Sequence, residues 1–535
     1  MKKLVATAGG TLLVAGLALI APATSTAASD SGGNPAAAAR EYIQQNPGKV
    51  LGSADEAYVV EDTIASQDGE SQVRFTRTYD TLPVLGGDFV VHLNAADKAD
   101  GLSLAQEESI QASTTPSIKK AQASQKARDE FEGNNIGEAG DPTLVIDARE
   151  GEPVLAWQTT VTGMQADGQT PSRQIIVTDA NDGTVRSVTE TITTPIKIGQ
   201  PTNQRSSAST VSSVAATGSG QAIYVGKVTL NTTGSGSSYT MVDTTHGNNR
   251  TCDLNNGTTV CTTFADADNA WGNGTQSNRA SAGVDAHYGA AKTFDYFKLT
   301  FGRNGIFNNG TGVPSRVHYG RSYSNAYWDG SQMTYGDGAN NQNPLVALDV
   351  AGHEMTHGVT QNTAALNYTG DAGGLNEATS DIFGTMVEFY ANNPSDPPDF
   401  LIGEKINIYG DDTPLRYMDD PSKDGVSYSC WNTTVPNADP HYSSGVGNHF
   451  FFLLANGSGA STYGNSPTCN GSTVAGIGRA KAAAIWYAAL TQYMTSTETY
   501  AKARLDTVSA ATGLYGASST AVAAVKAAWS AVSVN

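Results

Sequence analysis

The sequence predicts an α+β protein of several domains, and three observations support this prediction. At 535 residues, the chain is long enough to fold several units with separate cores. A stretch rich in Ser, Thr, Ala and Gly, from Thr193 to Gly220, divides the chain into two parts that differ in composition and sequence pattern. In the second part, strand-like patterns prevail before Pro344 and helical periodicity prevails after it.

Residues 1–28 have the pattern of a secretory signal peptide. Lys2 and Lys3 precede an apolar run from Leu12 to Ile20, and small residues follow as far as Ala28. A membrane anchor is the alternative, but this run is shorter than the roughly 20 residues that span a bilayer. We therefore expect a secreted, extracellular protein that is free of the membrane after cleavage near Ala27 or Ala28.

The charge of the chain argues against a nucleic-acid partner. The net charge is −19 and the pI is about 4.7. A protein that binds nucleic acid needs clustered Lys and Arg, and no basic run here exceeds the pairs Lys2–Lys3 and Lys119–Lys120. The acidity itself indicates only that the chain is soluble.

The four cysteines of an exported chain are expected to form two disulfides. Three pairings are possible. We favour Cys252 with Cys261 and Cys430 with Cys469, because each pair flanks a loop rich in Gly and Asn. Metal binding by these cysteines is the alternative, but the sequence has no CxxC spacing to support it.

The first part of the chain reads as a small α+β region without a catalytic cluster, followed by a linker over residues 193–218 that contains the processing site. Helices are predicted from Ala36 to Gln45 and from Ile118 to Phe131. The predicted strands are Val73 to Tyr79, a pair joined by a turn within Leu82 to His92, Leu144 to Ile146, Pro153 to Val161, Gln174 to Asp179 and Val185 to Val188.

The second part is predicted to have a strand-rich lobe over residues 219–363 and a helical lobe over residues 364–535. In the first lobe we expect strands at Ala222 to Leu230, Tyr239 to Asp243, Arg316 to Tyr319 and Gln332 to Gly336, and a helix at Val284 to Phe301. The second lobe is expected to contain helices at Leu375 to Tyr390, Val446 to Ala455, Ile477 to Thr491, Tyr500 to Thr512 and Thr520 to Val532.

One more helix is predicted at the junction of the two lobes, where a cleft is expected. Asn343 and Pro344 form a cap followed by proline at the first helical position. The residues that follow are apolar nearly all round the helix, so this helix should be central and buried. Gly352 inside it should cost roughly 1 kcal/mol relative to Ala, which indicates that another element packs closely there.

The junction helix carries the sequence His353-Glu354-Met355-Thr356-His357. Two histidines four residues apart lie on one helical face, so both imidazoles can reach one metal ion. The intervening Glu354 is placed to act on a water molecule rather than to bind the metal. A buried helix with a salt bridge is the alternative, and a third metal ligand would decide between them.

Glu377 is the candidate for the third ligand. It is predicted to lie in the first turn of the next helix, with Asp381 one turn later on the same face, where Asp381 could hold a histidine ring. The alternative is that both carboxylates merely favour the positive helix N-terminus. Together with the two histidines, the three-ligand interpretation is preferred, since a catalytic zinc takes three protein ligands and keeps one position for water.

The pattern His353-Glu354-x-x-His357 followed by Gly374-x-Asn376-Glu377-Ala378-x-Ser380-Asp381 resembles the thermolysin family of secreted zinc metalloproteases, the group of thermolysin, bacterial elastase and vibriolysin. The resemblance covers about residues 220 to 535. It implies a two-lobed catalytic domain with the zinc helix between the lobes. The metzincin alternative needs a glycine and a third histidine where this chain has Thr360 and Thr363, so it is excluded.

The resemblance implies a role for each matching residue. His353, His357 and Glu377 would bind zinc, with Asp381 and Asn376 behind the histidines. Glu354 would be the general base, and Tyr368 and His441, the latter oriented by Asp439, would stabilise the oxyanion. Substrate would be bound by Asn325 and Ala326 on an edge strand, by Arg416, and by an apolar pocket of Val350, Ile402 and Leu415.

The resemblance also implies at least one structural calcium, held by Asp349, Glu388, Asp399 and Glu404. Glu388 and Glu404 as ordinary surface acids are the alternative. Leu401 stands where thermolysin has a glutamate shared between two calcium ions, which argues against a second calcium in this cluster.

The first part of the chain resembles a fungalysin/thermolysin propeptide over residues 29–100, through Arg74-Phe75, Leu82 to Gly87 and Val90 to His92. Residues 110–192 are similar to a PepSY domain, through Leu144 to Val188. These resemblances imply a monomeric endopeptidase for protein and peptide substrates that is made as a precursor inhibited by its own propeptide. A secreted binding module with a structural zinc is the rival function, but it would leave Glu354 without a role.

Overall fold

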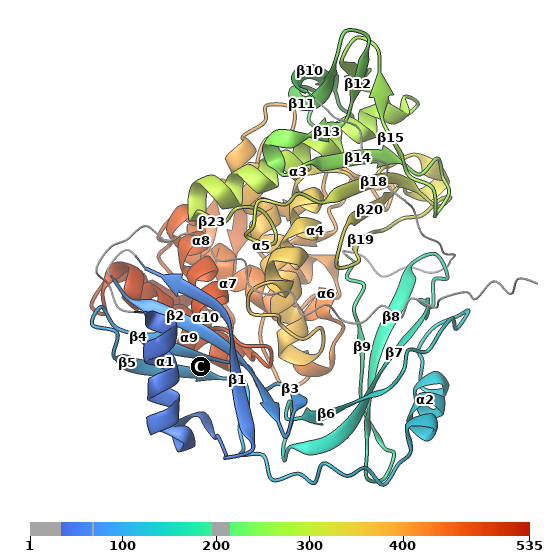
Figure 1. Cartoon of the computed structure of the whole chain (residues 1–535). Coiled ribbons are helices and arrows are strands. Elements are labelled where there is room, and N and C mark those ends of the chain that lie inside the picture. The colour runs from blue at the N-terminus through green and yellow to red at the C-terminus, as the bar shows by residue number, and fades with distance from the viewer. Residues whose placement is uncertain (1–33, 67–68, 195–213) are drawn as a thin grey trace, which may run out of the picture.

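A computed structural model describes residues 34–66, 69–194 and 214–535 of the chain. The predicted signal peptide and most of the predicted linker lie outside these residues. In Figure 1 the N-terminal units lie below, and the two lobes of the second part lie above and beside them. The α+β class is confirmed, because strands dominate up to Gly336 and helices dominate beyond Leu348.

The N-terminal unit packs one helix on a curved sheet. Its elements are α1 (Pro35–Gln45), β1 (Glu56–Ala65), β2 (Ser71–Tyr79), β3 (Leu82–Leu85), β4 (Phe89–Leu93) and β5 (Ala99–Leu104). β2 begins two residues before the predicted strand, and both of its faces are largely buried. Val73 and Phe75 face the α1 core, whereas Arg74 on the other face lies against the helical lobe and hydrogen-bonds there.

The next unit contains α2 (Lys120–Asp129), β6 (Thr143–Asp147), β7 (Val154–Met164), β8 (Pro171–Asp179) and β9 (Val185–Glu190). Its strands do not form a separate sheet. β3 pairs in parallel with β6, with Val84 opposite Ile146, so the two units share one nine-stranded sheet in the order β5-β4-β2-β3-β6-β7-β8-β9, with β1 paired to β2. The two segments with separate resemblances are therefore joined by direct strand pairing.

The strand-rich lobe is built around the long helix α3 (Arg279–Phe301), which begins five residues earlier than predicted because Asn278 caps it. Its strands are β10 (Ala215–Gln221), β11 (Lys227–Ser235), β12 (Ser238–Thr240), β13 (Val242–Asp243), β14 (Asn249–Asp253), β15 (Thr262–Thr263), β16 (Ala265–Asp266), β17 (Ala270–Gly272), β18 (Pro314–Tyr319), β19 (Ala326–Trp328) and β20 (Met333–Gly336). They form a five-stranded and a six-stranded sheet, and β19 is a terminal strand of the second, paired within that sheet only to β20.

The predicted strand from Ala222 to Leu230 is wrong in its first half. Ala222 to Gly226 form the turn of a hairpin, in which Gly226 has a φ of +67° that disfavours other residues, and β11 begins only at Lys227. β10 also starts at Ala215, inside the predicted linker. Glycine suits this strand because a side chain at Gly218 would collide with Asn269, and one at Gly220 would collide with Val284.

The helical part consists of α4 (Leu348–Gln361), α5 (Gly370–Ala391), α6 (Pro440–Ser443), α7 (Gly445–Asn456), α8 (Arg479–Ala488), a π-turn (Ala489–Tyr493), α9 (Tyr500–Tyr515) and α10 (Thr520–Ala531). The junction helix α4 starts at Leu348, not after Pro344 as predicted. The Pro344 carbonyl accepts from the Tyr224 hydroxyl and the Leu345 amide donates to Gly336, so these residues are tied to the other lobe and cannot begin a helix.

The predicted close approach at Gly352 is confirmed. A methyl group added to Gly352 would lie 2.9 Å from the Cα atom of Gly384 on α5, and one added to Gly384 would lie 2.5 Å from the Asp349 carbonyl oxygen. Two glycines therefore bring α4 and α5 into backbone contact. This contact sets the separation of the functional side chains on the two helices.

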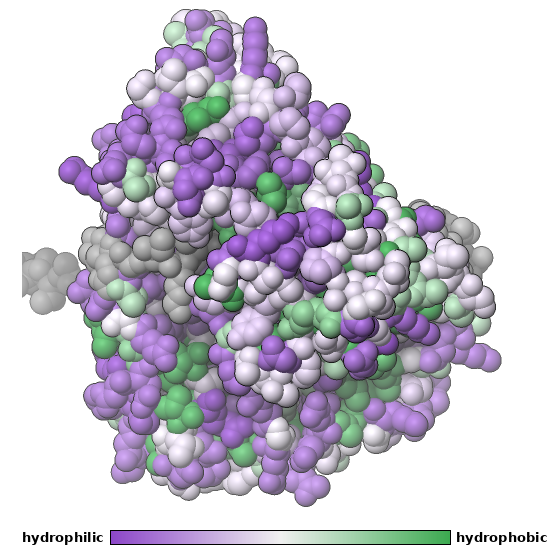
Figure 2. Space-filling view, turned by 180° about the vertical axis from the view of Figure 1, so that it is seen from behind, coloured by the Kyte–Doolittle hydropathy of each residue, from purple (hydrophilic) through white to green (hydrophobic). Residues whose placement is uncertain are grey.

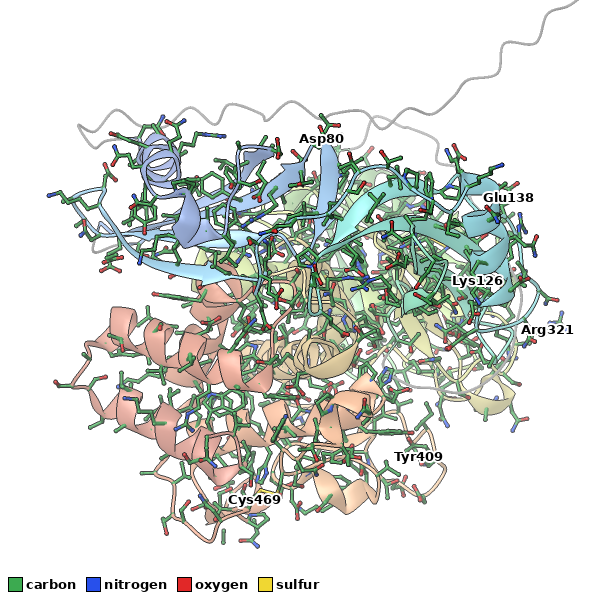
Figure 3. The ribbon with its side chains drawn as sticks, turned by 90° about the horizontal axis from the view of Figure 1, so that it is seen from below. Asp80, Lys126, Glu138, Arg321, Tyr409 and Cys469 are labelled. Carbon is green, nitrogen blue, oxygen red and sulfur yellow. A yellow bond between two sulfur atoms is a disulfide. The ribbon has the colours of Figure 1, made fainter. Side chains whose placement is uncertain are left out.

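Both predicted disulfides are present, Cys252–Cys261 and Cys430–Cys469. Figure 3 shows Cys469 at the edge of the helical lobe. Among the residues that the structure describes, no helix is both long and apolar enough to cross a membrane. The face in Figure 2 is mostly hydrophilic, with its apolar residues in small groups.

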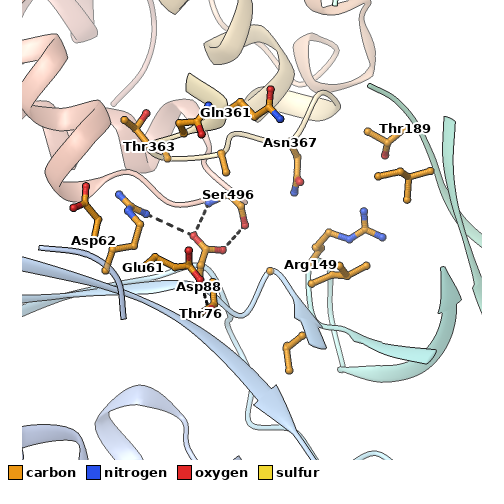
Figure 4. A pocket seen from close by; sticks show the side chains of 18 of the residues that line it. Glu61, Asp62, Thr76, Asp88, Arg149, Thr189, Gln361, Thr363, Asn367 and Ser496 are labelled. Carbon is orange, nitrogen blue, oxygen red and sulfur yellow. Dashed lines mark hydrogen bonds and ion pairs between the residues drawn. The ribbon is translucent and has the colours of Figure 1, made fainter. Parts of the chain in front are cut away.

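The N-terminal units are fastened to the helical lobe by polar contacts. Asp88 accepts hydrogen bonds from the amide and the hydroxyl of Ser496 and faces the Arg74 guanidinium at 3.8 Å, as Figure 4 shows for Asp88 and Ser496. Arg74 donates to the carbonyls of Thr491 and Met494. A cavity of about 720 Å³ lies beside these contacts, between the N-terminal units and the second part of the chain.

Candidate metal centre and active site

Helices α4 and α5 bring three candidate metal ligands together. The Nε2 atoms of His353 and His357 lie 3.1 Å apart, and each lies 3.4 Å from one carboxylate oxygen of Glu377. All three side chains are buried. Glu377 does not lie in the first turn of its helix, as predicted, because α5 starts seven residues earlier at Gly370. The alternative of a helix N-terminal carboxylate is thereby excluded.

Each histidine is oriented through its other ring nitrogen. Nδ1 of His353 lies 2.8 Å from Oδ1 of Asp381, and Nδ1 of His357 lies 2.9 Å from Oδ1 of Asn376. Since both partners are acceptors, the proton of each neutral ring sits on Nδ1 and the Nε2 lone pair points to the centre of the cluster. Burial lowers the pKa of both histidines, that of His357 to about 4, so the rings are neutral.

The donor set of this cluster fits zinc. Two neutral imidazoles and one carboxylate, all within 4.8 Å of one another, are three of the ligand types that zinc takes in catalytic sites. Oε2 of Glu377 is buried without a hydrogen bond, which is costly unless a cation balances it. The three residues would therefore hold zinc with a position open for water.

Glu354 lies on the same helix as the two histidines and is completely buried. Neither of its carboxylate oxygens makes a hydrogen bond of normal geometry to a described residue. Burial, and then the charge of Glu377, raise the pKa of Glu354 well above its usual range. Such a carboxyl group, directly after the candidate ligand His353 in the chain, is suited to take up a proton.

Tyr368 and His441 both lie beside Glu377, and Nε2 of His441 is 3.7 Å from Oε1 of Glu377. The Tyr368 hydroxyl lies 3.4 Å from Nε2 of His441 and donates to Glu377. Nδ1 of His441 lies 2.6 Å from Oδ1 of Asp439, which also caps the short helix α6. Two donor groups therefore point to one place beside the candidate metal.

Arg416 is a buried side chain beside the site. Its Nε and Nη2 atoms each lie 2.7 Å from Asp381, whose second oxygen also accepts from Asn448 at 2.8 Å. These contacts hold the pKa of Asp381 far below its usual range despite its burial. Arg416 and His353 thus both hydrogen-bond to the same carboxylate, that of Asp381.

The predicted apolar pocket residues lie close to one another. Leu415 donates its amide to the Ile402 carbonyl at 2.7 Å, and Val350 and Leu415 belong to one buried apolar cluster. A cavity of about 590 Å³ opens at Leu415 and is also lined by Arg416 and His441. Its outer rim includes Tyr409, which Figure 3 shows on a loop at the edge of the molecule.

The predicted substrate strand forms one rim of the site. Ala326 begins β19, and the side chain of Asn325 accepts the Ala326 amide. The outer edge of β19 is not open, because Thr193 forms an antiparallel bridge with Trp328. Figure 1 shows β9 leading towards β19 from the N-terminal units. The carbonyl of the next residue, Thr194, accepts a hydrogen bond from Nε2 of His441.

A second cluster of possible metal ligands lies near the other end of α4. It consists of Glu388, Glu404 and Asp396, and the last of these is absent from the predicted set. Oε1 of Glu388, both Asp396 oxygens and Oε2 of Glu404 are buried without a hydrogen bond. Burial and the surrounding carboxylates, Asp349 and Asp399 among them, raise the pKa of Glu388 to about 11.

Asp396 was not predicted as a metal ligand because it lies in a loop, where no periodic sequence pattern indicates which way a side chain points. The only signal in the sequence is its position between Glu388 and Glu404 in an acidic stretch. Asp349 and Asp399 border the cluster instead of belonging to its closest group. Asp349 accepts the Gly403 amide and Asp399 accepts the Leu401 amide, so one oxygen of each is already engaged.

Residues 217–361 match the family model of the thermolysin metallopeptidase catalytic domain, and residues 364–534 match that of its α-helical domain. Residues 56–103 match the fungalysin/thermolysin propeptide motif.

Three relatives illustrate the similarity. A transglutaminase-activating metalloprotease of Streptomyces mobaraensis is 48% identical over 492 residues, which are 90% of this chain and 61% of that protein. Bacillolysin of Bacillus cereus is 38% identical over 86% of this chain and 82% of its own. Thermolysin of Alicyclobacillus acidocaldarius subsp. acidocaldarius is 36% identical over 87% of this chain and 84% of its own. The chain thus spans about three fifths of the first relative and more than four fifths of the other two.

Proposed function

Because this chain is a metallopeptidase of the thermolysin family, we propose that it is a secreted zinc endopeptidase made as an inactive precursor. The observation that carries this proposal is the cluster of His353, His357 and Glu377, with the buried Glu354 beside it. Three ligands and an adjacent base are what the hydrolysis of a peptide bond by a metal-activated water requires.

The proposed chemistry assigns one task to each side chain around the cluster. Zinc bound there would polarise the scissile carbonyl and lower the pKa of a water molecule. Glu354 takes a proton from the attacking water and delivers it to the leaving nitrogen. Tyr368 and His441 donate hydrogen bonds to the oxygen that becomes negative, and the loss of one such donor typically costs about 100- to 1,000-fold in rate.

Specificity is proposed to reside in the apolar group of Val350, Ile402 and Leu415. All three side chains are buried, and Leu415 lines the cavity that also contains His441, which favours a bulky hydrophobic residue after the scissile bond. Asn325 and Ala326 are proposed to bind the substrate backbone by strand addition. Arg416 is proposed to bind a substrate carbonyl in the cavity that it lines, while its ion pair with Asp381 holds the guanidinium in place.

We also propose that the cluster of Glu388, Asp396 and Glu404 holds one calcium ion. Carboxylate oxygens are the ligands that calcium prefers, and four buried oxygens there lack hydrogen bonds. Asp349 and Asp399 add negative charge at its border. Lys405 faces Asp396 at 3.6 Å and supplies one positive charge, while Leu401 has no carboxylate to offer, so a second calcium has less support.

The N-terminal units are proposed to inhibit the enzyme until the chain is cut after them. The contact of Thr193 and Thr194 with β19 and His441 supports this role, because it covers the rim of the site. The signal-peptide pattern of residues 1–28 supports export, and a monomer remains the expectation.

The variant Glu354→Gln tests the proposal, with Asp268→Asn, an exposed carboxylate of the same lobe, as control. We expect Glu354→Gln to retain zinc and lose casein hydrolysis by at least about 100-fold. A chelator should abolish activity of the unchanged chain, and zinc should restore it. Normal casein hydrolysis by the variant would refute the catalytic assignment, and four protein ligands around zinc would favour the rival binding module.

A further inference from the structure

The loop that carries Tyr368 is held in shape by contacts from outside it. Residues 362–369 connect α4 to α5. Ala365 in this loop has a φ of +50°, a left-handed conformation that residues other than glycine rarely adopt, so its surroundings must stabilise it. The Tyr368 hydroxyl donates to Glu377 and lies 3.4 Å from Nε2 of His441. Its position relative to both groups depends on how firmly the loop backbone is held.

Two hydrogen bonds from other elements hold the backbone just before Tyr368. The Asn367 amide donates to the Ser496 carbonyl at 3.0 Å. Nδ2 of Asn376, on α5, donates to the Leu366 carbonyl at 3.0 Å. Leu366 is buried in the large apolar core of the helical lobe, so its carbonyl depends on a protein partner. A buried acceptor that loses such a partner typically costs about 1–3 kcal/mol.

The amide group of Asn376 makes a different contact at each end. Oδ1 lies 2.9 Å from Nδ1 of His357, whereas Nδ2 faces the Leu366 carbonyl. A carbonyl oxygen can only accept, so the NH2 end of the amide must face Leu366, and the oxygen end must face the ring N–H of His357. One buried amide therefore joins a candidate metal ligand to the loop of Tyr368.

We propose that Asn376 is a positioning residue for Tyr368 as well as for His357, and that its NH2 group fixes the tyrosine hydroxyl beside Glu377 and His441. The proposal rests on the proposed function, in which Tyr368 donates to the oxygen that becomes negative. The two ends of the amide then have separable effects. The oxygen end acts on metal affinity through the histidine ring, and the NH2 end acts on the rate through the tyrosine.

The size of the effect on the rate follows from the precision that a reacting site needs. A misplacement of roughly 1 Å can lower the rate about 100-fold, and the loss of one oxyanion donor typically costs about 100- to 1,000-fold. Releasing the Leu366 carbonyl loosens the backbone two residues before Tyr368 but leaves the hydroxyl in the molecule. The loss of rate should therefore be smaller than that caused by Tyr368→Phe.

The variant Asn376→Asp separates the two effects. Aspartate has nearly the same shape, and one of its oxygens can still accept from Nδ1 of His357, but the other has no hydrogen to donate to the Leu366 carbonyl. We expect zinc to be bound at least as tightly as by the unchanged chain, since a carboxylate behind a metal-binding histidine raises its basicity. For a fluorogenic peptide, kcat should fall at least about 10-fold while KM stays within about 3-fold.

The matched control is Asn362→Asp. Asn362 lies exposed in the same loop and donates from Nδ2 to the Gly358 carbonyl at 2.7 Å. Its replacement adds the same charge and removes the same kind of bond, but it lies six residues before Tyr368 and leaves the Leu366 carbonyl paired. We expect kcat of this control to stay within about 2-fold of that of the unchanged chain.

A double variant tests whether Asn376 acts through Tyr368. Combining Asn376→Asp with Tyr368→Phe should lower kcat by less than about 2-fold beyond Tyr368→Phe alone, because a hydroxyl that is absent cannot be misplaced. All kinetic values are measured on processed enzyme. The variant precursors are processed by a small amount of tagged unchanged enzyme, which is then removed by its tag.

Three results would overturn the proposal. One is a kcat of Asn376→Asp equal to that of the unchanged chain. Another is zinc binding weakened in proportion to kcat, which would end the role of Asn376 at His357. The third is a double variant in which the two single losses of kcat multiply. A failure of the proposed function is distinguishable, since the unchanged chain would then not hydrolyse the peptide even with zinc added.

The variant Asn376→Leu keeps the proposal testable if Asn376→Asp does not fold. It carries no charge and removes both contacts, so zinc affinity should fall about 10- to 100-fold. At zinc concentrations that saturate this variant, kcat should remain at least about 10-fold below that of the unchanged chain, because added zinc cannot restore the bond to Leu366. Full recovery of kcat at saturating zinc would contradict the role of the NH2 group.

Discussion

Asp381 is the residue whose replacement tests the organisation of the site most directly. Its two oxygens accept four hydrogen bonds at 2.7 or 2.8 Å, two of them from Arg416 and one each from His353 and Asn448. The variant Asp381→Asn keeps the shape but replaces one oxygen by an amide group, which is a donor. Two of the four bonds are then lost, and the amide hydrogens face other donors.

Two effects of different size are expected from Asp381→Asn. The loss of the carboxylate behind a metal-binding histidine typically weakens metal binding by about 10- to 100-fold, equivalent to roughly 1.4 to 2.7 kcal/mol. The buried Arg416 loses its ionic partner, and breaking a buried pair by removing one member typically costs about 3–5 kcal/mol of stability. The effect on the free energy of unfolding should therefore exceed that on zinc binding.

Both effects can be measured separately. Competition with a chromogenic chelator gives zinc affinity, and thermal unfolding of the metal-free protein gives stability. The double variant Asp381→Asn with Arg416→Met removes the unpaired charge, so it should regain most of the stability and none of the zinc affinity. Zinc binding by Asp381→Asn as tight as in the unchanged chain would refute the view that Asp381 orients His353.

Three further outcomes are expected. Two aspartates raise the pKa of His246 to about 9 although burial alone would lower it, so the stability that they add is complete below pH 6.5 and lost as pH rises through 9. His246→Gln should accordingly cost up to about 3 kcal/mol at pH 6 and little at pH 10, measured by thermal unfolding, and an equal cost at both pH values would contradict this. Replacing Cys430 and Cys469 by Ser opens a loop with a separation of 39 residues and should cost about 4 kcal/mol of stability under oxidising conditions, with no cost once the unchanged chain is reduced. Asp396→Asn should lower the stabilisation by calcium, and its melting temperature should equal that of the unchanged chain only when calcium is chelated.

The sequence was most informative where function follows local geometry. The spacing of His353 and His357 on one helix is a consequence of helical periodicity, so it could be read without any tertiary contact. Gly352 likewise signalled a close approach, because a glycine inside a helix is costly unless a neighbour needs the space. The two disulfides followed from spacing and from the loops between the cysteines.

Boundaries were predicted less well, since capping signals compete with distant contacts. Asn343 and Pro344 have the residue types of a helix start, yet hydrogen bonds to Tyr224 and Gly336 hold this stretch to the other lobe. Glu377 was expected in a first turn but lies deeper in α5, which has no strong cap at its true start. Local preference is weak compared with the energy of tertiary packing.

Some features were decided by the tertiary structure alone. Asp396 joins Glu388 and Glu404 through the path of an irregular loop, and β3 joins β6 across two segments that look separate in the sequence. Thr194 and His441 are 247 residues apart, and only the packing of the N-terminal units on the catalytic lobes brings them into contact. Helical and strand periodicity can be read directly from a sequence. Contacts between distant segments depend on how whole surfaces pack against each other, and no short sequence pattern encodes that packing.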